Sequence, residues 1–345
     1  MKPRLNSKQE RRVEMKKHLL VLSVVIFALT ASMPSFAAEA KSYNLRFGHV
    51  TATDFVYHIA AEKFANQISE KTGGKVKIAI FPNSQLGNEQ VLTDSLILGT
   101  LDFSITNQAY TSSYVPQFGF LSVSYLFMDN SHVERVMFDK KFSDMLTGFT
   151  EAKNPGYVYL ATLPSGVRSI YSTIPIKTFN ELKGYKLRIM PSEIETKVWK
   201  TLGTQPVSVP YGEVYSALQA KLAQGAENTP SAYYTAKHHE VAKYYILTEH
   251  QYLTANILAS KKLLSGMPAE YVNIIKQAAV DACKVGAKYA VESDGKILEK
   301  LGKEGITVTK IDKEPFIKAI YPLHKEIATS MKCMDMYTRI QELAK

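Results

Sequence analysis

The sequence predicts an α/β protein of two lobes with mixed sheets and a long helix. Short apolar runs alternate with segments of helical period through the first half of the chain, a pattern typical of βαβ units around a mainly parallel sheet. Two strand-like runs are separated by Pro164-Ser165-Gly166, where we expect the chain to cross between lobes. A helical period continues from Pro268 toward Leu301, and Gly286 or Gly295 offers a point for a bend.

The elements of the first half follow from hydrophobic period and from glycine stop signals. Apolar runs of strand length predict strands at residues 44–49, 76–81, 101–106, 157–163 and 167–173. Helical spacing predicts helices at residues 56–71, which Gly73-Gly74 ends, and at residues 89–98, which Gly99 caps. Ser131 and Glu134 have the spacing of a capping box, so we expect a further helix to begin at Ser131.

The second half contains two more capping boxes. Thr178 with Glu181 and Ser192 with Glu195 bracket a strand at residues 186–190. The other predicted elements of this half are a helix at 213–223, a short strand or turn at 225–228, a strand at 251–260, the long helix that Pro268 begins, a last strand at 306–311 and terminal helices at 315–343.

Residues 1–37 have the three parts of a secretory signal peptide. Met15-Lys16-Lys17-His18 is basic, residues 19–31 are apolar, and Ser35-Phe36-Ala37 matches a small-x-small cleavage site. The apolar run is shorter than the roughly 20 residues that a bilayer requires, which argues against a transmembrane anchor. We therefore expect export from the cytoplasm, with Met15 as a candidate for the true start because the basic pair directly follows it.

The charge balance does not favour a nucleic-acid partner. The whole chain has a net charge of +10, but without residues 1–37 it retains 35 basic and 30 acidic side chains, a net charge of +5. No later apolar run has membrane length, so we expect the mature chain to be soluble. Cys283 and Cys333, its two cysteines, match neither a metal cluster nor a disulfide framework. Their spacing leaves open one bridge or two buried thiols.

The common catalytic and cofactor signatures are missing from the sequence. It contains no GxGxxG after a strand, no GxxxxGK[ST], no HExxH, no GxSxG and no CxxC. His238-His239-Glu240 is the nearest approach to a metal cluster, but neighbouring residues of a helix point about 100° apart and do not easily share one ion. These absences count against an enzyme, and we expect no cofactor and no metal.

Arginine placement points to an anion site. Arg188 falls inside an apolar strand, where a buried charge without a partner costs several kcal/mol. Its planar guanidinium suits a carboxylate, so the partner is either an organic acid in a cleft or an internal acid such as Glu213 or Glu227. Arg168, which follows the Pro-Ser-Gly break, has the same two interpretations.

Two kinds of ring complete the candidate site. Tyr211 follows Pro210 at the entry to a predicted helix, where an aromatic face with a polar tip can cover a small ligand, and Tyr233 is one of several tyrosines in predicted loops or helix starts, most of which we expect to pack. His49 ends the first predicted strand, and ligands of open α/β sheets bind beyond the carboxyl ends of strands. His49 is therefore a candidate ligand contact, although a lone histidine is more often a packed one.

Several motifs in order along the chain resemble the DctP-type substrate-binding proteins of TRAP transporters. They cover nearly the whole mature chain and are FPNSQLG at 81–87, GTLDF at 99–103, GYKLRIMP at 184–191, LGTQPV at 202–207, PYGEVYSALQ at 210–219, GAEN at 225–228, VAKYY at 241–245 and LTEH at 247–250. The resemblance implies a periplasmic binding protein-like fold whose two α/β lobes, joined by strands and a long bent inter-lobe helix, close over one ligand.

The resemblance also implies domains, partners and a ligand class. Lobe I would comprise residues 38–165 with about 254–293, and lobe II residues 166–253 with about 294–345. The ligand would be a small organic acid, delivered to the small and large subunits of a TRAP membrane permease by a protein that we expect to be monomeric. A sugar acid such as a uronate is the first candidate, with a C4-dicarboxylate, a 2-oxo acid or an aromatic acid as alternatives.

Residue roles carry over onto matching positions only. Arg188 matches the family's carboxylate-clamping arginine and Arg168 a second arginine of some members, while Asn228 matches a ligand-contacting asparagine and Tyr211 the aromatic that covers the ligand. Asn107, Gln108 and Tyr233 complete the predicted contacts. Sialic-acid-binding relatives often have an acid where this chain has Thr106-Asn107-Gln108, and uronate-binding relatives often have a tryptophan in place of Pro230.

Two competing hypotheses remain at this point. An exported hydrolase or lyase would use a histidine and a carboxylate near the cleft, such as His49 with Asp54, and turnover of a bound acid would reveal it. A sensor would bind the same ligand with the same fold but signal through a membrane kinase, and neighbouring genes would distinguish it.

Overall fold

A computed structural model describes residues 6–9, 11–12, 14–16 and 41–345. Residues 1–42 and 43–345 form separate units. The apolar region and the cleavage site of the predicted signal peptide, residues 19–37, lie outside the described residues. Within the described residues, none of the helices combines the length and the apolar composition needed to cross a bilayer.

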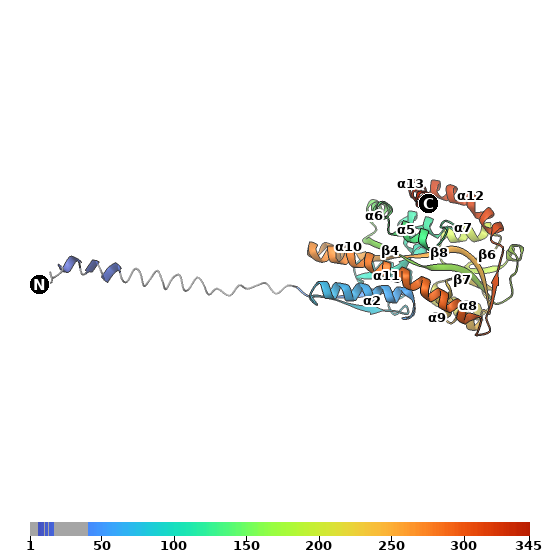
Figure 1. The fold of residues 1–345 in the computed structure, drawn as a ribbon, viewed down its shortest axis with the longest axis horizontal. Coiled ribbons are helices and arrows are strands. Elements are labelled where there is room, and N and C mark those ends of the chain that lie inside the picture. Colours follow the sequence, from blue (N-terminus) through green and yellow to red (C-terminus); the bar gives the residue numbers. More distant parts are fainter. Residues whose placement is uncertain (1–5, 10, 13, 17–40) are drawn as a thin grey trace. The chain divides into compact units, whose positions relative to one another are not determined.

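Residues 43–345 form a two-lobed α/β structure around one mixed sheet (Figure 1). Its strands are β1 (Tyr43–Gly48), β2 (Val76–Phe81), β3 (Phe103–Asn107), β4 (Tyr157–Ser172), β5 (Lys186–Ile189), β6 (Gln205–Ser208), β7 (Gly225–Asn228), β8 (Tyr244–Ser260) and β9 (Thr307–Lys310). The strand order is β2-β1-β3-β8-β4-β7-β5-β6, and β9 pairs with β8.

Two long antiparallel strands, β4 and β8, join the two halves of the sheet. One end of β8 pairs with β3 from Ala255 to Ala259, and its other end pairs in parallel with β9 from Tyr244 to Leu247. β4 pairs with β8 over most of its length and with β7 at its own C-terminal end. The parallel pairs β1–β2 and β5–β6 therefore belong to different lobes that share these two strands.

The strand predictions around Pro164-Ser165-Gly166 were wrong in one respect, because β4 continues through this segment. Pro164 pairs with Thr254, and the next pair is Val167 with Tyr252, so β4 carries one more residue than β8 between these pairs. The extra residue forms a bulge, and Gly166 takes a φ of +100°, which glycine adopts without a Cβ clash. The segment bends the strand without ending it.

The helices pack on both sides of this sheet. They are α2 (Val56–Lys71), α3 (Glu89–Leu98), α4 (Gln108–Thr111), α5 (Asn130–Met137), α6 (Lys140–Lys153), α7 (Glu193–Thr201), α8 (Val214–Gln219), α9 (Pro230–Thr235), α10 (Lys261–Ser265), α11 (Ala269–Leu301), α12 (Glu314–Ser330) and α13 (Met334–Glu342), with 3₁₀ turns at Pro116–Ser122, Phe179–Leu182, Tyr211–Glu213 and His238–Glu240.

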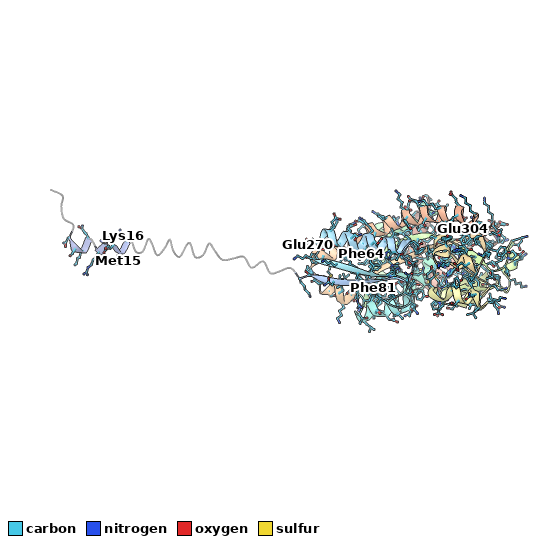
Figure 2. All side chains as sticks on the ribbon, turned by 90° about the horizontal axis from the view of Figure 1, so that it is seen from below. Met15, Lys16, Phe64, Phe81, Glu270 and Glu304 are labelled. Atoms are coloured by element: carbon cyan, nitrogen blue, oxygen red, sulfur yellow. The ribbon has the colours of Figure 1, made fainter. Side chains whose placement is uncertain are left out.

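Helix α11 confirms the predicted long helix. It has 33 residues, with Pro268 at its N-cap, and so extends about 50 Å at 1.5 Å per residue. Figure 2 shows Glu270, in its first turn, at one end of the 43–345 unit and Glu304, just past the end of the helix, in the opposite half. Its buried face is rich in alanine, and a Cβ on Gly286 would lie 2.5 Å from Leu163 Cδ1. Small residues therefore let α11 approach α2 and β4 closely.

Several helix starts differ from the sequence prediction. The N-cap of α5 is Asp129 rather than Ser131, and its Oδ1 accepts a hydrogen bond from the His132 N–H at 2.7 Å. A carboxylate ahead of Ser131 therefore takes the capping position. Ser192 does cap α7, as predicted. Thr178 precedes only a 3₁₀ turn, and the predicted helix at 213–223 shortens to α8 after a 3₁₀ turn.

Candidate functional site

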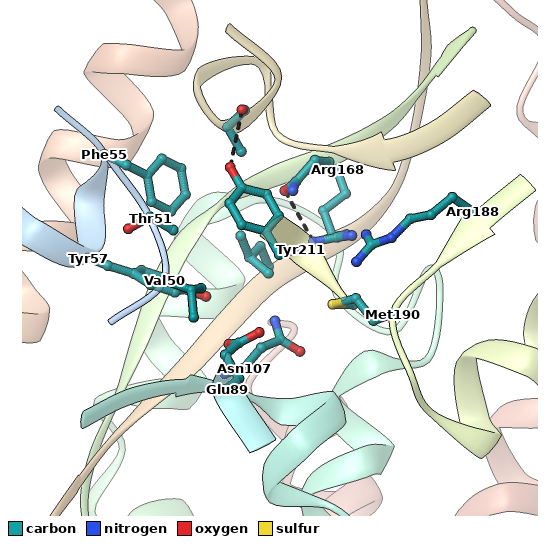
Figure 3. A pocket seen from close by; sticks show the side chains of 13 residues that line it. Val50, Thr51, Phe55, Tyr57, Glu89, Asn107, Arg168, Arg188, Met190 and Tyr211 are labelled. Atoms are coloured by element: carbon teal, nitrogen blue, oxygen red, sulfur yellow. Dashed lines mark hydrogen bonds between the residues drawn. The ribbon is translucent and has the colours of Figure 1, made fainter. Parts of the chain in front are cut away.

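A cavity lies where segments of both lobes meet, and it contains about 360 Å³ of unfilled space, its mouth included. Its walls come from the segment after β1, from β3 and the start of α3, and from β4, β5 and β7 together with Tyr211. Apolar and aromatic side chains line most of it, and two arginines, two asparagines, one glutamate and one threonine supply polar groups besides the tyrosine hydroxyls (Figure 3). This composition is typical of a site for one small polar ligand.

Arg188 is a buried cation whose charge is not paired. It projects from β5, is 1% exposed, and its Nε donates to the Val209 carbonyl at 2.8 Å. Its Nη2 has no hydrogen-bond partner among the described residues, and no carboxylate there lies within ion-pair distance of it. Figure 3 shows the guanidinium directed into the cavity beside Arg168 and Met190. An anionic ligand would supply the missing partner.

Arg168, in contrast, already has its anion. Its Nε and Nη2 each donate to a carboxylate oxygen of Glu227 at 2.5 Å, and Nη2 also donates to the Glu227 carbonyl at 2.9 Å. Burial opposes ionisation of Glu227, but the charge of Arg168, the neighbouring His250 and the hydrogen bonds from Arg168 lower its pKa to about 2. Of the two interpretations open for Arg168, the internal ion pair is the one that forms.

Asn228 and Tyr211 both line the cavity. Asn228 Oδ1 accepts hydrogen bonds from Arg168 Nη1 at 3.2 Å and from the Thr229 N–H at 2.9 Å. These two bonds orient the amide, which leaves its Nδ2 group as a donor toward a ligand. The Tyr211 ring stands at the centre of the close-up in Figure 3, and its hydroxyl donates to the Ala232 carbonyl at 3.4 Å.

Glu89 is a cavity residue that the sequence reasoning missed. It is the first residue of α3, after the N-cap Asn88, and its Oε1 accepts a hydrogen bond from the Asn107 N–H at 2.7 Å. Burial raises the pKa of Glu89 to about 7, although the Asn107 N–H and the charges of Arg188 and Arg168 oppose the shift. Glu89 begins a helix that follows β2 and its loop, and this position was the sequence signal that could have identified it as a site residue.

The other predicted contacts separate into two groups. Asn107 lines the cavity, where its Oδ1 caps α4 through the Ala109 N–H at 2.8 Å. Gln108, His49 and Tyr233 are buried but do not line it. Gln108 exchanges hydrogen bonds with Asn256 at 2.7 and 3.4 Å, and the Tyr233 hydroxyl donates to the Ala242 carbonyl at 2.6 Å.

The His238-His239-Glu240 segment serves packing. His238 Nδ1 lies 2.7 Å from the Tyr171 hydroxyl, and burial, followed by the charges of Arg188 and His239, lowers the pKa of His238 to about 3. The His239 ring stacks on Tyr234 with centroids 4.5 Å apart. Nowhere in the part of the chain that the structure describes do three or more His, Cys, Asp or Glu side chains form a group able to hold a metal ion.

Comparison with known proteins gives concordant results. The chain is 31% identical over 309 residues to the 2,3-diketo-L-gulonate-binding periplasmic protein YiaO of Escherichia coli, covering 89% of this chain and 92% of the relative. A TRAP periplasmic solute-binding protein of Xanthobacter autotrophicus, solved with bound β-D-galacturonate, superposes with a TM-score of 0.82 at 32% identity over 86% of this chain and 99% of the other.

A second solved structure has the same fold. The sugar acid binding protein DctPAm of Advenella mimigardefordensis, in complex with galactonate, gives a TM-score of 0.83 at 26% identity over 88% of this chain and 99% of that one. The family model described as "Bacterial extracellular solute-binding protein, family 7" (DctP) matches residues 47–330. The chain therefore belongs to the DctP family of bacterial extracellular solute-binding proteins.

Proposed function

We propose that this protein is a periplasmic receptor that binds a sugar acid in the interlobe cavity and delivers it to a TRAP-type membrane permease. The observation that carries the proposal is Arg188, a fully buried guanidinium that ends in the cavity with its Nη2 unpaired among the described residues. Burying such a charge without an anion destabilises a protein, so a bound carboxylate would stabilise it by pairing with the guanidinium.

The solved relatives support the sugar-acid class. Galacturonate, galactonate and diketogulonate, which appear in the names of the similar proteins, each combine one carboxylate with several oxygen substituents. The cavity has matching chemistry, because it places one unpaired cation among side chains that donate and accept hydrogen bonds. A C4-dicarboxylate, a 2-oxo acid or an aromatic acid offers the carboxylate but fewer partners for Asn107, Asn228 and Glu89.

The binding step needs no covalent chemistry. The ligand carboxylate would accept two parallel hydrogen bonds from Arg188, the Asn228 amide would donate to a ligand oxygen, and the Tyr211 ring would cover one face. Residues from both lobes line the cavity, so contacts to a bound ligand favour the closed arrangement of the lobes. A receptor of this kind releases its ligand unchanged, and family membership is what favours a receptor over an enzyme.

The location and partners follow from the family rather than from the cavity. Export through the signal peptide at residues 1–37 would place the protein in the periplasm, and the small and large permease subunits would receive the ligand. The receptor would act as a monomer with no cofactor.

Calorimetric titration of the purified mature protein tests the proposal. The wild type should bind one or more of D-galacturonate, D-glucuronate and D-galactonate more tightly than succinate, pyruvate or benzoate. Arg188→Met should weaken that binding by about a hundredfold or more, because two charge-assisted hydrogen bonds contribute roughly 3 kcal/mol. Arg188→Lys should recover only part of it, since an ammonium cannot form the two-pronged contact.

Lys183→Ala is the matched control, because Lys183 is an exposed cation close to Arg188 in sequence. Equal affinities of Arg188→Met and Lys183→Ala would exclude Arg188 as the carboxylate contact. Mass spectrometry of the recovered ligand checks that it leaves unchanged, and conversion of the acid would favour an enzyme instead.

A further inference from the structure

A row of four polar side chains in contact connects the surface of α2 to the cavity wall. Glu62 Oε1 lies 3.5 Å from His58 Nε2, His58 Nδ1 lies 3.0 Å from His49 Nε2, and His49 Nδ1 lies 3.1 Å from Thr51 Oγ1. The Glu62 side chain is 53% exposed and the His58 side chain 14%, whereas His49 is 0% exposed. Thr51 is the last side chain of this row and lines the cavity.

The directions of the two hydrogen bonds depend on the histidine tautomers, and they follow once His58 is neutral with its proton on the nitrogen that faces Glu62. Glu62 Oε1 lies at ion-pair distance from His58 Nε2, and a carboxylate favours a proton on the nitrogen that faces it. In a neutral His58, Nδ1 is then an acceptor, and His49 Nε2 must donate to it. His49 Nδ1 is left without a proton in the neutral ring, so it accepts the hydroxyl proton of Thr51.

We propose that Thr51 contacts the bound sugar acid as a hydrogen-bond acceptor for one of its hydroxyl groups, and that His49 and His58 are positioning residues that hold the Thr51 proton away from the cavity. The proposal rests on the proposed function. It adds a second recognition element to Arg188, because Figure 3 shows Thr51 and Arg188 on opposite sides of the cavity. One end would bind the carboxylate and the other a hydroxyl.

The surroundings of His49 support a neutral ring. Burial, with a smaller contribution from His58, lowers the pKa of His49 to about 3. Thr51 is itself held in place by its backbone, because its carbonyl accepts a hydrogen bond from the Asn83 N–H at 2.9 Å. A hydroxyl whose position and proton direction are both fixed discriminates between a ligand donor and a ligand acceptor at that point.

Titration of variants with D-galacturonate tests the contact. Thr51→Val keeps the shape but removes the acceptor, and it should weaken binding about tenfold, the usual effect of one lost hydrogen bond. Thr51→Ser should stay within a few-fold of the wild type. Thr150→Val is the control, because Thr150 is a buried threonine whose hydroxyl donates to Leu146 within α6, away from the cavity.

The positioning role has its own pair of variants. His58→Asn retains an acceptor oxygen near the place of Nδ1 and should bind like the wild type, whereas His58→Leu should approach Thr51→Val. Nitrogen-15 NMR of the unliganded and ligand-saturated protein should show His49 protonated at Nε2 and not at Nδ1. The tautomer of His49 reports the direction of the hydrogen bonds, and the affinities of the His58 variants report whether that direction matters for ligand binding. If the histidines served packing alone, the two observations would be unrelated.

The outcomes separate this inference from the proposed function. Unchanged affinity of Thr51→Val, or a His49 proton at Nδ1, would overturn the inference, while the proposed function would stand if Arg188→Met still weakened binding about a hundredfold. If the wild type binds no sugar acid at all, the proposed function itself fails.

Discussion

At the scale of single residues, the two buried arginines show how one side-chain type acquires different roles. Both are 1% exposed and both line the cavity. Arg168 on β4 meets Glu227 on the neighbouring strand β7, where Ile170 pairs with Glu227 and Ser169 with Asn228. β5 meets β7 only at the pair Leu187–Gly225, so Arg188 reaches the cavity with no acid opposite it. Strand register therefore decides which arginine is neutralised.

Glu89 provides a pH-dependent prediction at this scale. Its folded-state pKa of about 7 exceeds the ordinary glutamate value of 4.5, so between these pH values the folded protein holds a proton there that the unfolded chain loses. The stability that protonated Glu89 contributes is complete below pH 4.5 and is lost as the pH rises through 7. Glu89→Gln removes this dependence, so its unfolding free energy should rise relative to the wild type by roughly 2–3 kcal/mol between pH 4.5 and 8.

Urea unfolding of both proteins across this pH range measures the difference. Glu193→Gln is the control, since Glu193 is the corresponding first-turn glutamate of α7 and is exposed. A constant difference between Glu89→Gln and the wild type at all pH values would contradict the raised pKa.

At the scale of elements, the bulge in β4 and the helix α11 are coupled through a carboxylate. Asp294 on α11 accepts hydrogen bonds from the backbone N–H and the hydroxyl of Ser231, at 3.1 and 2.5 Å, and Ser231 lies at the start of α9. A Cβ on Gly166 would lie 2.1 Å from Asp294 Oδ2. The bulge, α11 and the segment after Asn228 therefore meet at one point beside the cavity.

This junction predicts opposite effects for two glycine substitutions. Gly166→Ala imposes a φ of +100° on an alanine and forces it against Asp294, so it should lower the unfolding free energy by roughly 2–4 kcal/mol and weaken ligand binding. Gly295→Ala lies on the same helix as Asp294 with no atom within 4 Å of the new Cβ. It should raise the unfolding free energy by about 0.5–1 kcal/mol through helix propensity.

Urea unfolding and calorimetry of the two variants measure both effects. Equal stability of Gly166→Ala and Gly295→Ala would show that the bulge relaxes around a side chain. Loss of stability without loss of binding in Gly166→Ala would show that the junction does not position the cavity wall.

At the scale of the whole molecule, the two cysteines belong to different parts of the interior. Cys283 packs in the core around α2 and α11, and Cys333 packs in the core that contains Trp199 and Phe316. Both are free thiols, and burial raises the pKa of each. The sequence spacing left open one disulfide or two buried thiols. The structure has two buried thiols, because separate cores cannot bring the two sulfurs together.

We expect two consequences for the intact protein. Its melting temperature should not change with a reducing agent, and both thiols should react with iodoacetamide only after unfolding in guanidinium chloride without reductant. Mass spectrometry counts the modified thiols. Denatured, unreduced protein that takes up no alkyl group would contain a disulfide and contradict this packing.

Sequence predictions that depend on local signals agree with the structure, and those that depend on the folded backbone do not. Helices α2 and α3 and strand β2 have the predicted bounds, because their apolar period and glycine stops are local signals. The start of α5 was wrong because Asp129 and Ser131 are both able to cap, and only the folded backbone selects one. The lobe boundaries proposed near residues 165, 254 and 294 remain predictions.

The sequence by itself determined the α/β class, the long helix, the family and the presence of an arginine on an apolar strand that requires an anion. Each of these depends on residues close together in the chain or on motifs read in order. Only the tertiary structure decided that Glu227 neutralises Arg168, that Glu89 enters the cavity, and that Gln108 and Tyr233 turn away from it. These outcomes depend on partners brought from distant segments by strand register and helix packing, which local patterns do not encode.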